Sequence, residues 1–234
     1  GEVQFVRQMI DAHHERAGET GARIVHFCGF DSIPSDLGVL MVQEHALSEH
    51  RRPCDEIKFV LQRAKGGFSG GTIDSMVNLF EEMGEDSSLR KLLGNPYALN
   101  PDGERQGPDG GDQVRPRYDE QVGAWTGPFV MAAANTRVVR RTNALKDYAY
   151  GRDFRYSEVM GMGDGPAGMV RAGLLSAGLG SLTGALAIGP TRRLLQKTVL
   201  PEPGEGPSRE SIENGYFIVE LFGSFQHSER TVEA

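Results

Sequence analysis

One stretch constrains the fold more than any other: an apolar run that breaks at a tight loop and restarts as a helix pattern. The run covers residues 24–28, the loop reads Gly29-Phe30-Asp31-Ser32-Ile33-Pro34, and the helix pattern starts at Ser35. A bounded apolar run of this length is typical of a buried strand, and serine is a favoured helix N-cap. Ligands of open α/β sheets gather at strand ends and helix N-termini, so we expect the loop to line any binding site.

The rest of the chain alternates helix and strand patterns, which predicts an α/β fold. We expect helices over residues 2–17, 35–50, 73–83, 87–93 and 129–145, and strands over 56–64, 153–160 and 215–225. Residues 94–128 are polar, with frequent glycine and proline, and we expect one long loop there. Such a loop inside a domain is usually a functional lid or a mobile segment.

Charge and cysteine content exclude several classes of function. The net charge is -7, which argues against nucleic acid as a partner because phosphate binding needs a basic face. The two cysteines, Cys28 and Cys54, have neither disulfide-framework nor metal-ligand spacing, and no zinc motif is found. Cys28 lies in the apolar run and is expected to be a buried small hydrophobe. This content fits a reducing, cytoplasmic setting.

Two segments have unusual side-chain composition. Arg137, Arg140 and Arg141 crowd the end of the 129–145 helix, where they form either a solvated basic face or a contact with phosphate or carboxylate. Between Arg171 and Arg192 there is no charge, and small and apolar residues dominate. A buried or subunit-facing helix pair is the first expectation for residues 168–195, and a lipid-contacting surface is the alternative.

Two glycine-rich segments match catalytic or cofactor motifs formally. Gly67-Phe68-Ser69-Gly70-Gly71 matches the nucleophile elbow of serine hydrolases, with Asp147, Asp153 or Asp164 and then His227 downstream. Only one or two strands precede Ser69, and no oxyanion loop of the His-Gly-Gly type is found, so this hydrolase stays an alternative. Gly163, Gly165 and Gly168 match the dinucleotide fingerprint, but Pro166 stiffens the turn and no acidic residue follows about twenty positions on.

Several strings together resemble a known enzyme family. They are Gly29-Phe30-Asp31-Ser32-Ile33-Pro34-Ser35-Asp36-Leu37-Gly38, Gly67-Phe68-Ser69-Gly70-Gly71-Thr72, Pro128-Phe129-Val130-Met131-Ala132, Val139-Arg140-Arg141-Thr142-Asn143-Ala144-Leu145 and Pro203-Gly204-Glu205-Gly206-Pro207-Ser208. They resemble the saccharopine dehydrogenase-like oxidoreductases, in the branch that includes the trans-acting enoyl reductases of mycobacterial lipid synthesis. The likeness covers most of the chain.

The resemblance implies a domain organisation and a fold. Residues 1–50 would be the C-terminal remnant of a Rossmann-like nucleotide-binding domain, whose Gly-rich βα turn is not found in this sequence. Residues 51–234 would be a substrate-binding and dimerisation domain, with a mixed or antiparallel sheet covered by helices. Arg23–Ala46 would then be the hinge between the two.

The resemblance also implies a function: reduction of a double bond in a lipid or polyketide-type substrate by NAD or NADP. Asp31 and Ser32 become catalytic candidates, and Gly29, Phe30 and Asp31 cofactor-binding candidates. The candidates for substrate binding are Ser35, Gly67, Ser69, Gly70, Gly71 and Thr72. The implied partners are an acyl-chain or other small-molecule substrate, a second copy of the chain, and a lipid or membrane surface through residues 172–191. A non-catalytic lipid- or protein-binding module is a further alternative.

Overall fold

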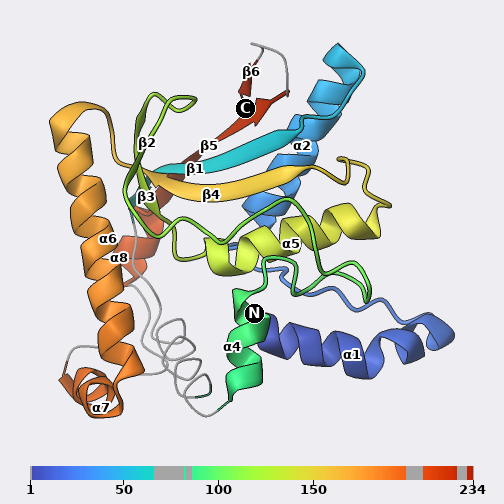
Figure 1. Ribbon diagram of the computed structural model, residues 1–234, viewed down its shortest axis with the longest axis horizontal. Helices are drawn as coiled ribbons and strands as arrows, with labels where there is room; N and C mark the ends of the chain where they lie inside the picture. Colours follow the sequence, from blue (N-terminus) through green and yellow to red (C-terminus); the bar gives the residue numbers. More distant parts are fainter. Residues whose placement is uncertain (1, 66–81, 83–85, 199–207, 226–230, 234) are drawn as a thin grey trace.

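A six-stranded mixed sheet organises the computed structural model, which describes residues 2–65, 82, 86–198, 208–225 and 231–233. The strands in spatial order are β2 (Arg117–Asp119), β3 (Ala124–Pro128), β4 (Arg155–Gly161), β1 (Glu56–Lys65), β5 (Tyr216–Ser224) and β6 (Thr231–Glu233). The central pair, β1 and β4, is parallel, and the other neighbours are antiparallel. The α/β fold with a mixed sheet is therefore confirmed (Figure 1).

Seven helices accompany the sheet in the described part of the chain. They are α1 (Val3–Thr20), α2 (Ile33–His50), α4 (Ser87–Gly94), α5 (Ala132–Leu145), α6 (Gly165–Ala187), α7 (Gly189–Thr198) and α8 (Arg209–Glu213). The predicted helices at 2–17, 35–50, 87–93 and 129–145 and the predicted strands at 56–64, 153–160 and 215–225 are confirmed with small shifts of their ends. The helix predicted at 73–83 lies almost entirely outside the described residues.

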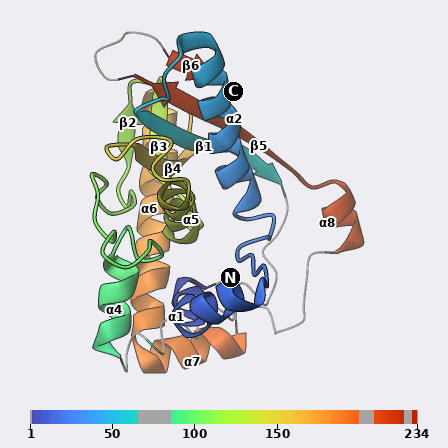
Figure 2. The same cartoon turned by 90° about the vertical axis from the view of Figure 1, so that its right-hand side faces the viewer.

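Two helices cover one face of the sheet and close the main core. Val39 and Val42 of α2 and Val139 of α5 are fully buried against strand residues such as Ile57 and Tyr156. Side chains alternate between the two faces of a strand, so Ile57, Phe59 and Leu61 of β1 all point into this core. The opposite face carries a smaller apolar cluster of Val60, Val159 and Phe222. Figure 2 shows α2 and α5 on the same side of the strands.

The apolar run of residues 24–28 is not a strand, and that prediction is wrong. The segment has no regular secondary structure, and the side chains of Ile24 and Val25 are 58% and 74% exposed. Phe27 has a φ of 58°, in the left-handed region, which no continuous strand tolerates. Cys28, expected to be buried, is exposed as well. Apolar character alone does not bury a run that has no neighbouring strand among the described residues.

The segment predicted as one long loop contains two strands. A turn at Val122 and Gly123 joins β2 to β3, and the φ of 68° at Gly123 suits glycine. β3 extends the sheet because Thr126, Gly127 and Pro128 pair with the end of β4. The lone Trp125 lies on β3, with its ring edge-on to that of Tyr118. Residues 95–116 do form an irregular loop.

The uncharged segment forms the expected helix pair, α6 and α7, but α6 is not buried within the described fold. In both views α6 starts beside β2 and β3 and extends beyond the sheet toward α7 (Figures 1 and 2). Leu174 is 69% exposed and Val170 55% exposed, whereas Ala172 and Leu186 are buried. By length and composition α6 is able to cross a membrane, and 11% of its most apolar stretch is buried.

Candidate functional site

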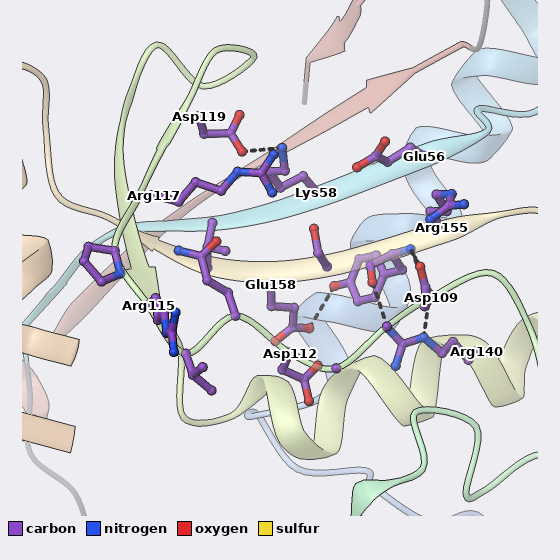
Figure 3. A pocket seen from close by; sticks show the side chains of 18 residues that line it. Glu56, Lys58, Asp109, Asp112, Arg115, Arg117, Asp119, Arg140, Arg155 and Glu158 are labelled. Atoms are coloured by element: carbon purple, nitrogen blue, oxygen red, sulfur yellow. Dashed lines mark hydrogen bonds and ion pairs between the residues drawn. The ribbon is translucent and has the colours of Figure 1, made fainter. Parts of the chain in front are cut away.

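A cavity of about 540 Å³ lies between the 109–117 loop and the strands β1 and β4. β4 pairs with β1 along one edge, but along its other edge only its last residues pair with β3. The first half of that second edge therefore faces the loop. Figure 3 shows charged side chains on all sides of this space. The lining includes Glu56, Lys58, Asp109, Gly110, Gly111, Asp112, Arg115, Arg117, Asp119, Arg140, Arg155, Tyr156 and Glu158.

The wall formed by the loop is held in place by the arginines of α5. Arg140 Nε donates to Asp109 Oδ2 at 2.6 Å, and its two Nη atoms donate to the carbonyl oxygens of Pro96 and Tyr156 at 3.0 and 2.9 Å. Arg137 pairs with Asp112 and donates to the carbonyl of Leu93. Both guanidinium groups are almost fully buried.

Of the two interpretations from the sequence, contact with carboxylate is confirmed for Arg137 and Arg140, which pair with Asp112 and Asp109. The solvated basic face is wrong for Arg137 and Arg140, which are 4% and 5% exposed. The carboxylates that they contact belong to this chain and not to a ligand. Arg141 likewise donates to the carbonyl of Leu99. Because the three side chains bond the loop's carbonyl and carboxylate groups, the loop of residues 95–116 is anchored over much of its length.

A buried carboxyl group, that of Glu158 on β4, lies at the base of the cavity. It is 2% exposed, and its oxygens accept hydrogen bonds from the Tyr156 hydroxyl at 2.8 Å and from Asn135 Nδ2 at 3.1 Å. Asn135 on α5 in turn accepts a bond from Ser32 Oγ at 2.9 Å. Ser32, Asn135, Tyr156 and Glu158 thus form a chain of hydrogen bonds from the start of α2, through α5, to the sheet.

Burial raises the pKa of Glu158 from 4.5 to about 7. Hydrogen bonds from Tyr156 and Asn135 and the nearby Ser35 hydroxyl counteract this rise, and the negative charge of Asp112 adds to it. The Ser35 hydroxyl is buried close to Glu158 but makes no hydrogen bond of good geometry. A carboxyl group with a pKa near neutrality can both give and take a proton, as general acids and bases do.

Among the other charged groups of the cavity, one ion pair is buried. Lys58 of β1 bonds Asp119 at the end of β2, and both are largely buried. The Asp119 carboxylate also caps the β2–β3 turn by accepting from the amides of Gln121 and Val122. Arg115 and Arg117 are exposed at the rim. Among the described residues, no group of side chains has the arrangement of a metal site.

The structure separates the two catalytic candidates of the first loop. Ser32 is 1% exposed and belongs to the Glu158 hydrogen-bond chain, whereas Asp31 is exposed. Ser35 is also buried, beside Glu158. Ser32 and Ser35 therefore lie buried near Glu158, whereas the Asp31 side chain faces solvent.

The cofactor candidates Gly29, Phe30 and Asp31 form an exposed turn before α2. The amides of Ser32 and Ile33 are both bonded to the Gly29 carbonyl, and the Phe30 ring packs edge-on against Phe217 at 4.5 Å. These amides are not available to an anion.

The formal fingerprint at Gly163, Gly165 and Gly168 is explained by packing. Gly163 and Gly165 adopt φ values of 84° and 61°, and a Cβ on Gly168 would lie 2.0 Å from the Gly163 carbonyl oxygen. The same carbonyl accepts a bond from the Trp125 amide at 2.9 Å. These glycines thus form the tight turn from β4 into α6 and join it to β3.

The second predicted loop cannot be placed. The substrate-binding candidates Gly67, Ser69, Gly70, Gly71 and Thr72 lie outside the described residues, as does His227 of the hydrolase alternative. Asn135, Tyr156 and Glu158 were not predicted as site residues. The alternation of Tyr156, Glu158 and Met160 on a predicted strand places a carboxyl group on a core-facing side, and this was the signal that could have revealed Glu158.

Comparison with known proteins identifies relatives but no structural template. No family model matches the chain, and no solved structure matches it. A Mycobacterium tuberculosis protein with the provisional name trans-acting enoyl reductase is 42% identical over 232 residues, which cover 95% of this chain and 55% of the relative. Proteins named trans-acting enoyl reductase from Mycobacterium bovis and Mycobacterium ulcerans are 38% and 37% identical, with the same shares covered.

The chain spans about half the length of the curated relatives that it matches. Identity of this level over nearly the whole chain is far above what unrelated sequences share. It agrees with the resemblance of the strings around Gly29–Gly38 to this branch of enzymes, and none of the relatives above is named as a hydrolase. Over 95% of its length, the chain is a homologue of proteins named trans-acting enoyl reductase.

Proposed function

We propose that this chain is the substrate-side region of an NAD(P)-dependent enoyl reductase that reduces a double bond in a lipid or polyketide-type substrate. The observation that carries the proposal is the 37–42% identity to trans-acting enoyl reductases over 95% of the chain. The cavity at β4 supports it, because reduction of an enoyl group needs a proton source beside the acyl chain as well as a hydride donor.

The dinucleotide itself would be held mainly by residues other than those described here. The Gly29–Asp31 turn has its following amides already bonded, and the glycines of the β4–α6 turn serve packing. What this chain contributes is the cavity wall, the ordered loop of residues 95–116 and the hydrogen-bond chain that ends at Glu158. A saccharopine dehydrogenase-like organisation, with a nucleotide-binding domain that includes residues 1–50, belongs to the same proposal.

The exposed apolar segments suit this organisation. Ile24 and Val25 are exposed apolar side chains in a segment without regular secondary structure, which suits contact with a further part of such a nucleotide-binding domain. Leu174 and Val170 on α6 present apolar surface, which suits an acyl chain or a lipid surface. Flotation of the chain with phospholipid vesicles, compared with a Leu174→Asp variant, tests the second point. If the wild-type chain does not float with the vesicles, the membrane contact is refuted.

The main test follows nicotinamide fluorescence. For this chain alone we expect no saturable NADPH binding in the micromolar range, because the amides that follow the Gly29–Asp31 turn are already bonded. For the complete polypeptide encoded by the gene we expect NADPH oxidation on addition of a 2-butenoyl thioester and none with the saturated butanoyl thioester. Oxidation that is independent of the double bond, or no oxidation with any 2-enoyl thioester, would refute the reductase.

A further inference from the structure

The geometry of the cavity points to an unassigned catalytic residue. We propose that Glu158 exchanges a proton with the carbon next to the carbonyl of an acyl thioester bound in this cavity. The proposal rests on the proposed function for the class of substrate. It does not depend on a nicotinamide, because proton exchange at that carbon involves no oxidation or reduction.

Glu158 is placed to meet a ligand and not bulk water. It belongs to the lining of the cavity, and yet only 2% of its surface is exposed. Figure 3 shows its carboxyl group below β4, toward the loop that bears Asp112. A carboxyl group in this position borders the cavity and has little contact with solvent.

The hydrogen bonds leave the acid proton of Glu158 free to move. One oxygen accepts from the Tyr156 hydroxyl and the other from Asn135 Nδ2, and both donors are fixed by their own burial. The proton of the acid form therefore needs another acceptor. Within the described residues, the buried Ser35 hydroxyl is such a group, because it lies close enough to Glu158 to influence its pKa. A reactive carbon in the cavity is the second acceptor.

The neighbouring charges set the working pH of this group. Tyr156 faces Glu158 from β4, Ser35 from α2, Asn135 from α5, and Asp112 from the loop, while Asp36 of α2 acts on Tyr156. The acidic Asp112 and the burial both favour the neutral acid, and no arginine or lysine pairs with Glu158. With its pKa raised to about 7, the group is present in both protonation states near neutral pH.

Two backbone amides in the cavity wall are candidate donors for the carbonyl oxygen of a thioester. Gly110 and Gly111 lie in its wall, and their backbone amides make no hydrogen bond to the described part of the protein. Their position is fixed from one side by Asp109, which bonds Arg140 and the Tyr156 amide. Adjacent backbone amides of this kind stabilise an oxyanion when they are directed at it.

The step balances without a further reactant. The Glu158 carboxylate takes the proton from the α-carbon, and the electrons of the broken C–H bond form the enolate. Return of the proton from the Glu158 acid to the same carbon breaks the O–H bond and restores the thioester. In enoyl reduction the enolate is formed by hydride addition, so only the return of the proton from Glu158 to the carbon is needed.

The experiment uses S-butanoyl-N-acetylcysteamine in deuterium oxide, without nicotinamide, and counts incorporated deuterium by mass spectrometry. We expect the chain to catalyse exchange, at a rate that rises as the pH passes through about 7 because the carboxylate is the base. Glu158→Gln should lower the rate by about 100-fold or more, a typical contribution of a general base. Glu15→Gln, which changes an exposed carboxylate of α1 outside the cavity, should lower it by less than about three-fold.

A second variant guards against loss of folding in Glu158→Gln. Tyr156→Phe removes a bond that lowers the pKa of Glu158, so the pH profile of exchange should move to higher pH. No exchange by the wild type, equal exchange by Glu158→Gln, or an unmoved profile in Tyr156→Phe would each overturn the proposal. Exchange without enoyl reduction by the complete polypeptide would refute the reductase alone. Unchanged reduction by Glu158→Gln would refute the role of Glu158 alone.

Discussion

The loop of residues 95–116 is polar and yet partly buried, whereas helix α6 is apolar and yet largely exposed. The loop is polar, but Tyr97, Ala98, Leu99 and Asn100 are buried, and α5 arginines bond its carbonyl groups. The α6 helix is apolar, and most of its surface is exposed. Burial in this molecule depends on whether a segment finds partners. Charged side chains from α5 supply them for the loop, and α6 contacts the rest of the described fold chiefly at β3.

The largest expected effect comes from breaking the anchor of the loop. Arg140→Ala leaves Asp109 buried without its partner and removes bonds to Pro96 and Tyr156. We expect a loss of about 3–5 kcal/mol in the free energy of unfolding, the usual cost of an uncompensated buried charge. Urea denaturation measures it. Arg152→Ala, with a side chain 72% exposed, is the control and should change stability by less than about 0.5 kcal/mol. Equal effects of the two variants would contradict the anchor.

A somewhat smaller effect is expected from the buried acid beneath the loop. The pKa of Glu158 is raised from 4.5 to about 7 in the folded state, so the folded protein binds more protons than the unfolded chain between these values. Stability from this group is complete below pH 4.5 and is lost as the pH rises to 7. The loss amounts to roughly 3 kcal/mol, since one pKa unit corresponds to about 1.4 kcal/mol.

The measurement is the difference in unfolding free energy between Glu158→Gln and wild type at several pH values. The amide does not titrate, so the difference should move in favour of the variant between pH 4.5 and 7 and then stay constant. Taking the difference removes the contribution of Asp36, whose pKa is also raised by burial. A difference that is independent of pH would show that Glu158 is ionised in the fold as it is in the unfolded chain.

A pair of variants with one large and one very small expected effect separates the two ends of α6. Leu186→Ala removes a side chain that is 2% exposed and should cost about 2–5 kcal/mol. Leu174→Ala, twelve positions earlier in the same helix and 69% exposed, should change stability by less than about 0.5 kcal/mol. Thermal unfolding of the two variants side by side tests this. A large effect at Leu174 would mean that another surface covers α6 in solution.

The sequence predicted the elements that depend on local patterns. The periodicity of α1, α2 and α5 and the alternation in β1, β4 and β5 are local properties, and these elements were found. Residues 24–28 have the composition of a strand, but a strand also needs a neighbour, which local sequence does not reveal. The short strands β2 and β3 were missed for the opposite reason. Thr126 and Gly127 show little apolar alternation, and β3 exists because it pairs with β4.

The site was predicted only in part, because its contacts join distant segments. Ser32 was named from the loop that carries the family resemblance, but its partner Asn135 is 103 residues away. Glu158 has no distinguishing sequence motif. Its properties come from burial against α2 and α5, which only the assembled sheet creates. Similarly, nothing near Arg140 in the sequence indicates that Asp109 would bond it.

The bonds made by Arg140 have a consequence for the order in which the chain folds. They reach back 44 residues to Pro96 and 31 to Asp109, and forward 16 to Tyr156. The bond to Tyr156 requires that α5 and β4 already lie together, and the other two require that the loop has been laid against α5. Contacts that form after the main barrier contribute little to the folding rate and mostly slow unfolding. We therefore expect the Arg140 bonds to form late in folding: their loss would raise the unfolding rate and hardly change the folding rate.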